Sequence, residues 1–223
     1  MKLYPFQNKS DLERALANDI VKLAQQAIDL FGDVRILLSG GSTPFGVYEL
    51  LAQSGLDWKN VHIGLVDERF VPETDEHSNY RNLKKAMQNA IEVGVHLYPM
   101  VYDIENKEQN LRQANVHYAP FVERLDISFL GMGNDGHTAS LFPGDEVALA
   151  DLTKNDIQLI YTTAPSHPTQ RITCSSGLLR SAAHTFLLFT GADKKAVFDE
   201  AESKNYPIYQ LTKDLRNFYV FYC

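Results

Sequence analysis

Short apolar segments alternate with amphipathic segments along most of this 223-residue chain. The runs at 34–38, 61–66 and 184–189 have the near-continuous hydrophobicity of strands that are buried on both faces. Between such runs, apolar residues recur at the three- and four-residue spacing of helices that cover a core. Because helical crossovers join parallel strands, the alternation predicts a Rossmann-like three-layer αβα fold with a mostly parallel central sheet.

The predicted strands all contribute to this one sheet. They lie at 34–38, 61–66, 95–100, 126–133, 157–164, 184–191 and 218–223. The chain has no internal repeat, low-complexity tract or linker, so we expect a single domain over residues 1–223.

Caps and prolines mark the predicted helices. Ser10 and Glu13 form a capping-box pattern before a helical stretch that stops at Gly32, and Pro44 is suited to open a second helix. Further helices are predicted at 78–91, 105–125 and 192–203. Pro120 should kink or divide the helix at 105–125.

The composition excludes several classes of protein. The chain has 28 acidic and 21 basic residues and a net charge of -7, which disfavours a broad nucleic-acid surface. No apolar run approaches the ~18 residues of a membrane span, and the N-terminus has no signal-peptide pattern, so we expect a cytoplasmic protein. Cys174 and Cys223 lack the number and spacing of a disulfide framework, and no metal-ligand motif is present. We therefore expect free thiols, no bound metal, and neither membrane nor nucleic acid as a partner.

Polar, glycine-rich segments directly follow four of the predicted strands. They are SGGSTP at 39–44, DERFVP at 67–72, GMGNDGH at 131–137 and GADK at 191–194. Parallel strands place their carboxyl ends at one edge of a sheet, where ligands bind in open α/β folds. We therefore expect the four segments to meet.

The first of these segments has the features of a phosphate-binding loop. Gly40 and Gly41 allow the backbone to approach an anion, and Ser42 and Thr43 offer hydroxyl and N–H groups before a helix N-terminus. The loop lacks the G-K-[ST] ending of a nucleoside-triphosphate P-loop. A plain glycine turn with a Ser/Thr helix cap explains the same residues and stays open at this point.

Two basic residues could add charge to such a site. Arg69 can bind a phosphate through two hydrogen bonds, and Lys194 can supply a second positive charge. Either can equally be a solvated surface residue, and only the position after a predicted strand favours a role. Asp67 and Glu68 are adjacent, so their side chains point different ways and do not form an acid–base pair by spacing.

The segment GMGNDGH offers a candidate general base. His137 follows Asp135 by two residues, and imidazole is the base best matched to neutral pH. The glycines at 131, 133 and 136 have the G-x-G-x-x-G spacing of a dinucleotide-binding loop. That loop normally lies in the first βαβ unit and opens a long helix, whereas this one lies past the middle of the chain and a proline follows closely. Nicotinamide and flavin binding are therefore disfavoured.

The motifs LSGGSTP, DERFVP, DEHSN, GMGNDGHTASLFP and PTQRIT occur in this order, and with them the chain resembles the 6-phosphogluconolactonases over nearly its whole length. The segment around DGHTASLFP is the most specific of them. The resemblance implies an α/β domain related to glucosamine-6-phosphate deaminases and ribose-5-phosphate isomerases, without metal or cofactor. It also implies hydrolysis of 6-phospho-D-glucono-1,5-lactone in the pentose phosphate pathway. A small-molecule substrate is then the expected partner, bound by a monomer or small homo-oligomer.

The resemblance assigns roles to individual residues. It makes His137 the general base and Asp135 its neighbour in the site. The residues it implies for phosphate and substrate binding are Gly40, Gly41, Ser42, Thr43, Asp67, Arg69, Asn79, Gly133, Arg171 and Lys194.

Two other functions stay open. The deaminases share the glycine loop and the DGH histidine, but their segment resembles GHIAFNEP, in which a glutamate five residues after the histidine takes part in opening the sugar ring. Phe142 occupies that position here, and a phenyl ring cannot move a proton, which disfavours an aldose–ketose isomerase that releases an amine. A non-catalytic sugar-phosphate-binding protein would keep the glycine loop without needing His137.

Overall fold

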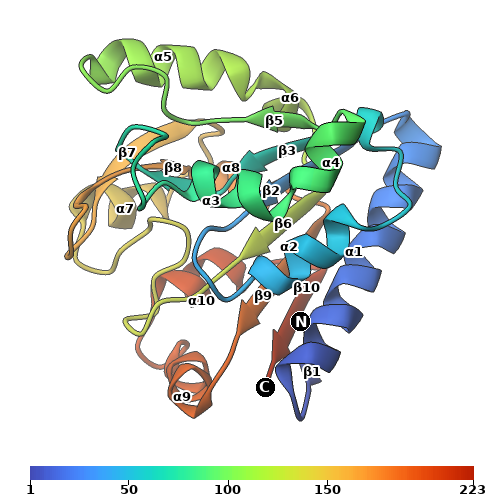
Figure 1. The fold of residues 1–223 in the computed structure, drawn as a ribbon. Coiled ribbons are helices and arrows are strands. Elements are labelled where there is room, and N and C mark those ends of the chain that lie inside the picture. The colour runs from blue at the N-terminus through green and yellow to red at the C-terminus, as the bar shows by residue number, and fades with distance from the viewer.

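A computed structural model describes residues 1–223, and a seven-stranded sheet forms its centre (Figure 1). In spatial order the strands are β1 (Lys2–Pro5), β10 (Phe218–Tyr222), β9 (His184–Phe189), β6 (Ile127–Leu130), β2 (Val34–Leu38), β3 (Val61–Leu65) and β5 (His96–Tyr98). Every neighbouring pair is parallel. The inner strands β2, β6 and β9 are buried along nearly their whole length, which explains their continuous apolar sequences. The predicted α/β fold with a mostly parallel central sheet is confirmed.

Helices flank this sheet. They are α1 (Lys9–Phe31), α2 (Phe45–Ala52), α3 (Asn79–Ala86), α4 (Gln88–Val93), α5 (Lys107–His117), α6 (Ala119–Glu123), α7 (Glu146–Asp151), α8 (Ser176–Arg180), α9 (Ala192–Glu200) and α10 (Pro207–Thr212), with a 3-10 turn at Trp58–Asn60. The chain adds strands in one direction from β1 to β2, β3 and β5, and in the other direction from β5 to β6, β9 and β10. Because crossovers between parallel strands are right-handed, the helices before β5 and the helices after β5 cover opposite faces of the sheet (Figure 1). None of the helices combines the length and apolar character needed to cross a membrane.

The direction in which strands are added reverses between β2 and β6. From β2 the chain continues to β3 and β5, then returns to β6 beside β2 and continues to β9 and β10. The connections that leave β2 and β6 therefore diverge. In open α/β sheets, this divergence leaves a crevice at the carboxyl ends of the strands.

Three short strands form a second, antiparallel sheet. Their order is β4 (Asp67–Arg69), β8 (Gln170–Cys174) and β7 (Leu159–Thr163). The prediction that 157–164 belongs to the central sheet is wrong, and DERFVP begins as a strand rather than a loop. Strand β4 has only three residues, and β8 mixes charged and polar residues with apolar ones, so neither has the hydrophobic run of a buried strand.

The first helix is capped differently from the prediction. The side chain of Asn8 accepts a hydrogen bond from the backbone N–H of Asp11 at 2.9 Å, so the helix begins before the predicted capping box of Ser10 and Glu13. Gly32 ends the helix as predicted, in the left-handed conformation with φ 88°.

Two predicted helices are each divided into two. The helix at 78–91 is interrupted at Met87, and the helix at 105–125 is interrupted at Tyr118, just before Pro120. The second break follows from the ring of Pro120, which cannot continue the preceding helix. Strand β1 was not predicted, because it is a mostly exposed edge strand without an apolar run.

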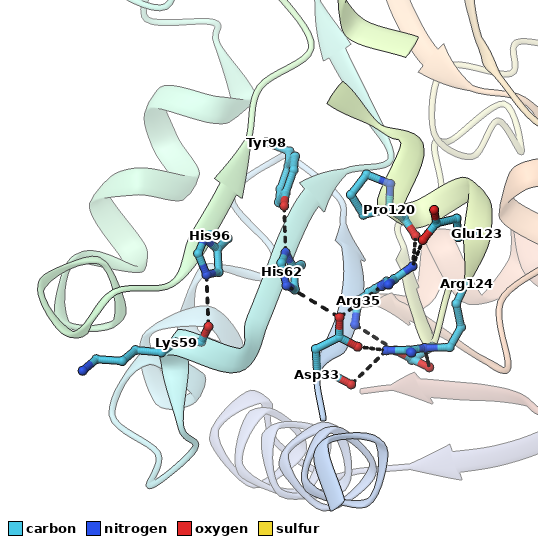
Figure 2. A network of polar contacts seen from close by, with 10 residues as sticks. Asp33, Arg35, Lys59, His62, His96, Tyr98, Pro120, Glu123 and Arg124 are labelled. Atoms are coloured by element: carbon cyan, nitrogen blue, oxygen red, sulfur yellow. Dashed lines mark hydrogen bonds and ion pairs between the residues drawn. The ribbon is translucent and has the colours of Figure 1, made fainter. Parts of the chain in front are cut away.

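A polar network lies at the amino ends of the central strands (Figure 2). The parallel register places His62 beside His96, and their rings stack with centroids 4.7 Å apart. The Nδ1 atom of His62 lies 2.7 Å from the hydroxyl of Tyr98, and Nε2 lies 3.7 Å from the carboxylate of Asp33. Asp33 also accepts from Arg124. This edge of the sheet is therefore charged and hydrogen-bonded, but it is opposite to the crevice.

Candidate active site

A cavity of about 370 Å³ opens at the carboxyl edge of the central sheet, beside the point where the strand order reverses. Among the predicted site residues, those that line it are Gly40, Gly41, Thr43, Asp67, Arg69, Asn79, Gly133, His137, Arg171 and Lys194. Asp135 lies behind His137 and contacts it, whereas Ser42 is exposed and does not line the cavity. The structure therefore brings together the polar segments that follow β2, β3, β6 and β9.

The glycine loop at 39–43 forms one wall of this cavity. Gly41 has φ 89°, which favours glycine, and a Cβ atom on Gly40 would lie 2.1 Å from the side-chain amide of Asn79. The backbone N–H groups at 40–43 donate to no acceptor in the protein. Since helix α2 follows directly, these amides lie near its positive N-terminal end. The wall is therefore suited to bind an oxyanion.

His137 is oriented by Asp135. Its Nδ1 lies 2.5 Å from Oδ1 of Asp135, and its backbone N–H donates to the same oxygen at 3.1 Å. Partial burial acts to raise the pKa of Asp135, but the hydrogen bond and charge of His137 outweigh it and hold that pKa below its usual range. An ionised acceptor at Nδ1 keeps the proton there, so Nε2 retains the lone pair of a base.

Two neighbours pack against the ring of His137. A Cβ atom on Gly133 would lie 2.1 Å from Nδ1, so a side chain at this position would displace the ring. On another side, the ring of Phe142 lies with its centroid 4.5 Å from that of His137. The position of the imidazole is therefore set by packing as well as by Asp135.

Two arginines lie opposite each other on neighbouring strands of the small sheet. The register of β4 and β8 pairs Arg69 with Arg171, and both line the cavity. Arg171 is only 7% exposed, and its Nε has no hydrogen-bond partner. Burial and the charge of Arg69 lower the pKa of Arg171, while Asp67 and Glu68 act in the opposite direction. An anion between the two guanidinium groups would relieve their repulsion and supply the missing partner.

A third cation lies near the first turn of α9. The Nζ atom of Lys194 donates to the backbone carbonyl of Met132 at 2.6 Å, which holds the ammonium beside the loop that follows β6. Burial lowers the pKa of Lys194, and the nearby charge of Asp135 opposes this effect. The cavity therefore combines three cationic side chains with one candidate base.

Several polar residues of the cavity were not singled out from the sequence. They are Ser39, Ser140, Ser166 and Thr190. Ser140 is fully buried, and its hydroxyl donates to the carboxylate of Asp67 at 2.5 Å. Two signals in the sequence could have identified these residues. Ser140 belongs to the DGHTASLFP motif, and Thr190 directly follows a strand. Ser166 follows β7 in the small sheet, whose existence the sequence did not reveal.

The sequence matches a family model described as glucosamine-6-phosphate isomerases/6-phosphogluconolactonase over residues 7–218. The chain belongs to this family. The 6-phosphogluconolactonase of Neisseria meningitidis is 35% identical over 211 residues, which cover 92% of this chain and 91% of that protein. That of Rhizobium meliloti is 34% identical over 204 residues, with 90% and 87% covered. A crystal structure of a 6-phosphogluconolactonase from Shewanella baltica has a TM-score of 0.90 at 28% identity and covers 100% of this chain and 96% of that one.

These similarities confirm the family resemblance expected from the motifs. The name of the glucosamine-6-phosphate isomerase/6-phosphogluconolactonase family covers two activities, and the relatives described above are named for the lactonase. Within this family, the contact between Phe142 and His137 is informative. It places an apolar ring where the deaminase motif has a glutamate, so the histidine has no carboxylate neighbour on that side.

Proposed function

We propose that the protein hydrolyses 6-phospho-D-glucono-1,5-lactone to 6-phospho-D-gluconate, the second step of the oxidative pentose phosphate pathway. The observation that carries this proposal is the Asp135–His137 pair beside a cavity that also contains Arg69, Arg171 and Lys194. A base and three cations in one small cavity suit a substrate with a phosphate at one end and a hydrolysable bond at the other. The names of the relatives support the choice of the lactone.

The substrate phosphate binds to the free amides at 40–43 and to the cationic side chains of the cavity. This contact uses the part of the substrate that does not react to fix the position of the part that does. The lactone carbonyl then lies beside Nε2 of His137 with an attacking water between them. Such positioning replaces an unfavourable encounter of free molecules with a reaction inside one complex.

Neutral His137 takes a proton from the water as its oxygen attacks C1 of the lactone. The negative charge that develops on the carbonyl oxygen is stabilised by a neighbouring cation or backbone N–H. When the bond between C1 and the ring oxygen breaks, the imidazolium returns its proton to that oxygen. One water is consumed, His137 regains its starting state, and no covalent intermediate on the protein is needed. The DGHTAS segment also differs from the G-x-S-x-G turn of serine hydrolases.

The first test removes the base. We expect His137→Ala to lower kcat by about 10²- to 10⁴-fold while the affinity for 6-phosphogluconate stays close to that of the unchanged protein. A pH-stat assay on freshly generated lactone, corrected for spontaneous hydrolysis, measures the first quantity, and titration calorimetry measures the second. An unchanged kcat would refute the role of His137.

The same assay separates the other two functions. Glucosamine 6-phosphate should release no amine, because Phe142 cannot move a proton. Binding of 6-phosphogluconate without lactone hydrolysis would instead support a non-catalytic sugar-phosphate-binding protein.

We further propose that the protein works in the cytoplasm as a single domain over residues 1–223, without a cofactor, as a monomer or small homo-oligomer. Light scattering after gel filtration measures the oligomeric state. Activity in the presence of a chelator, at the rate measured without it, would support a reaction that needs no metal.

A further inference from the structure

Glu68 is a buried carboxylate that the proposed reaction does not use. It lies in the middle of β4 between Asp67 and Arg69, is only 1% exposed, and does not line the cavity. No lysine or arginine side chain is hydrogen-bonded to it. Burial outweighs its hydrogen bonds and raises the pKa of Glu68 to about 7. A carboxylate is costly to bury in this way, so its contacts indicate what it does.

Four donors converge on this carboxylate. Oε1 accepts from the backbone N–H of Arg69 at 2.6 Å and from that of Asn79 at 2.8 Å. Oε2 accepts from the backbone N–H of Tyr80 at 2.7 Å and from the hydroxyl of Ser78 at 3.0 Å. The carboxylate therefore joins β4 to the first turn of α3. An ionised carboxylate accepts all four bonds, whereas an amide would direct its own N–H groups at two of the donors.

The elements joined by Glu68 carry cavity residues on both sides. Arg69 donates from Nη1 to the backbone carbonyl of His77 at 2.6 Å, and Asn79 donates to the backbone carbonyl of Asp67 at 3.0 Å. The amide of Asn79 also occupies the space beside Gly40 that a Cβ atom would need. A shift of α3 relative to β4 would therefore move the arginine and disturb the glycine loop together.

We propose that Glu68 is a positioning residue for substrate binding, which holds Arg69 and Asn79 in register with the glycine loop. The inference deepens the proposed function, on which its substrate rests. Because Glu68 acts through residues that bind the unreactive end of the substrate, its loss affects affinity more than turnover. A residue needed only for stability would affect neither quantity in the folded enzyme.

The test compares Glu68→Gln with Asp151→Asn in the full-length protein. Asp151 is 5% exposed and accepts from the backbone N–H of Ser176 at 2.6 Å, but it does not line the cavity. We expect Glu68→Gln to raise KM for the lactone and Kd for 6-phosphogluconate by about tenfold or more, with kcat within about threefold, because a displaced Arg69 loses a charge-assisted hydrogen bond to the unreactive phosphate. Asp151→Asn should lower Tm without changing KM or Kd. An unchanged KM and Kd in Glu68→Gln would overturn the proposal.

Ser78→Ala provides the second variant if Glu68→Gln does not fold. It removes one donor to the carboxylate and the side-chain cap of α3, and we expect a smaller rise in KM and Kd, whereas unchanged values would overturn the proposal. Binding of inorganic phosphate gives a measurement that does not depend on lactone hydrolysis. If the unchanged protein binds phosphate but does not hydrolyse the lactone, the proposed function fails, and the effect of Glu68→Gln on phosphate affinity still decides the role of Glu68. If the unchanged protein binds no phosphate, both proposals are refuted.

Discussion

In the loop after β6, Asp135 accepts a hydrogen bond from the Nδ1–H group of His137, which leaves the lone pair on Nε2. Asp135→Asn would place an amide N–H₂ group within reach of Nδ1 and favour the tautomer that has its proton on Nε2. We therefore expect kcat for lactone hydrolysis to fall by about 100-fold or more, with little change in KM. Steady-state kinetics measure both values.

The chain contains a matched control for this substitution. Asp75 and His77 have the same spacing, with Oδ1 of the aspartate 2.8 Å from Nδ1 of the histidine, but neither lines the cavity. Asp75→Asn should leave kcat unchanged. Equal kcat values in the unchanged protein and in Asp135→Asn would show that the tautomer of His137 does not limit the reaction.

The sequence predicted which residues line the cavity better than it predicted the contacts among them. The two-residue spacing of Asp135 and His137 is local, so the motif sufficed to pair them. The requirement for glycine at Gly133 arises from the folded position of the imidazole ring, which no local pattern describes. For the same reason, Ser140 could not be linked to Asp67 across 73 residues of sequence.

The pairing of β4 with β8 sets two arginines opposite each other. Arg171→Met would remove a buried charge whose Nε has no partner, so we expect Tm without ligand to stay the same or rise. Phosphate should bind about 10- to 100-fold more weakly, since a hydrogen bond to a charged group contributes about 1.5–3 kcal/mol. The stabilisation of the unchanged protein by inorganic phosphate should therefore be largely lost in the variant, as thermal unfolding with added phosphate would measure.

Two measurements on Arg171→Met would contradict this role of Arg171. An equal phosphate-induced shift of Tm in both proteins would show that Arg171 does not bind the anion. A substantial fall of Tm without ligand would show instead that the guanidinium stabilises the small sheet. Arg69→Met is the companion variant. It should also weaken phosphate binding, but it should raise Tm less, because it removes the hydrogen bond from Arg69 to the backbone carbonyl of His77.

The sheet that positions these arginines was the main element that the sequence did not predict. The central strands were found because burial on both faces requires continuous apolar runs. Strand β8 is identified by its pairing with distant segments, and its sequence QRITC has no run of that kind. The assignment of Arg171 to the site came from a family motif, whereas its partner Arg69 could be placed from its position after β3.

The two ends of the central sheet differ in the arrangement of their polar groups. The carboxyl ends carry cationic side chains and a loop whose backbone amides have no hydrogen-bond acceptor in the protein. The amino ends carry a network whose polar groups are hydrogen-bonded to one another (Figure 2). In the network, His62 stacks on His96, and the parallel pairing of β3 with β5 brings the two residues together. The network therefore lies apart from the candidate site, so its contribution to the pH dependence of stability can be tested separately.

Stability should fall as the pH is lowered through the range in which this network takes up protons. Burial lowers the pKa of His62, and the charge of His96 adds to that effect, while Asp33 opposes it. The unfolded chain, with an ordinary pKa of about 6.5, then takes up a proton before the folded one does. The contribution is complete above that pH and is lost below it, by up to about 1.4 kcal/mol per pH unit for one proton. We expect Tm, measured between about pH 7.5 and 5, to depend less on pH in His62→Gln than in the unchanged protein. The exposed His117, changed to Gln, serves as the control, and an equal pH dependence of Tm in His62→Gln and the control would contradict this origin of the effect.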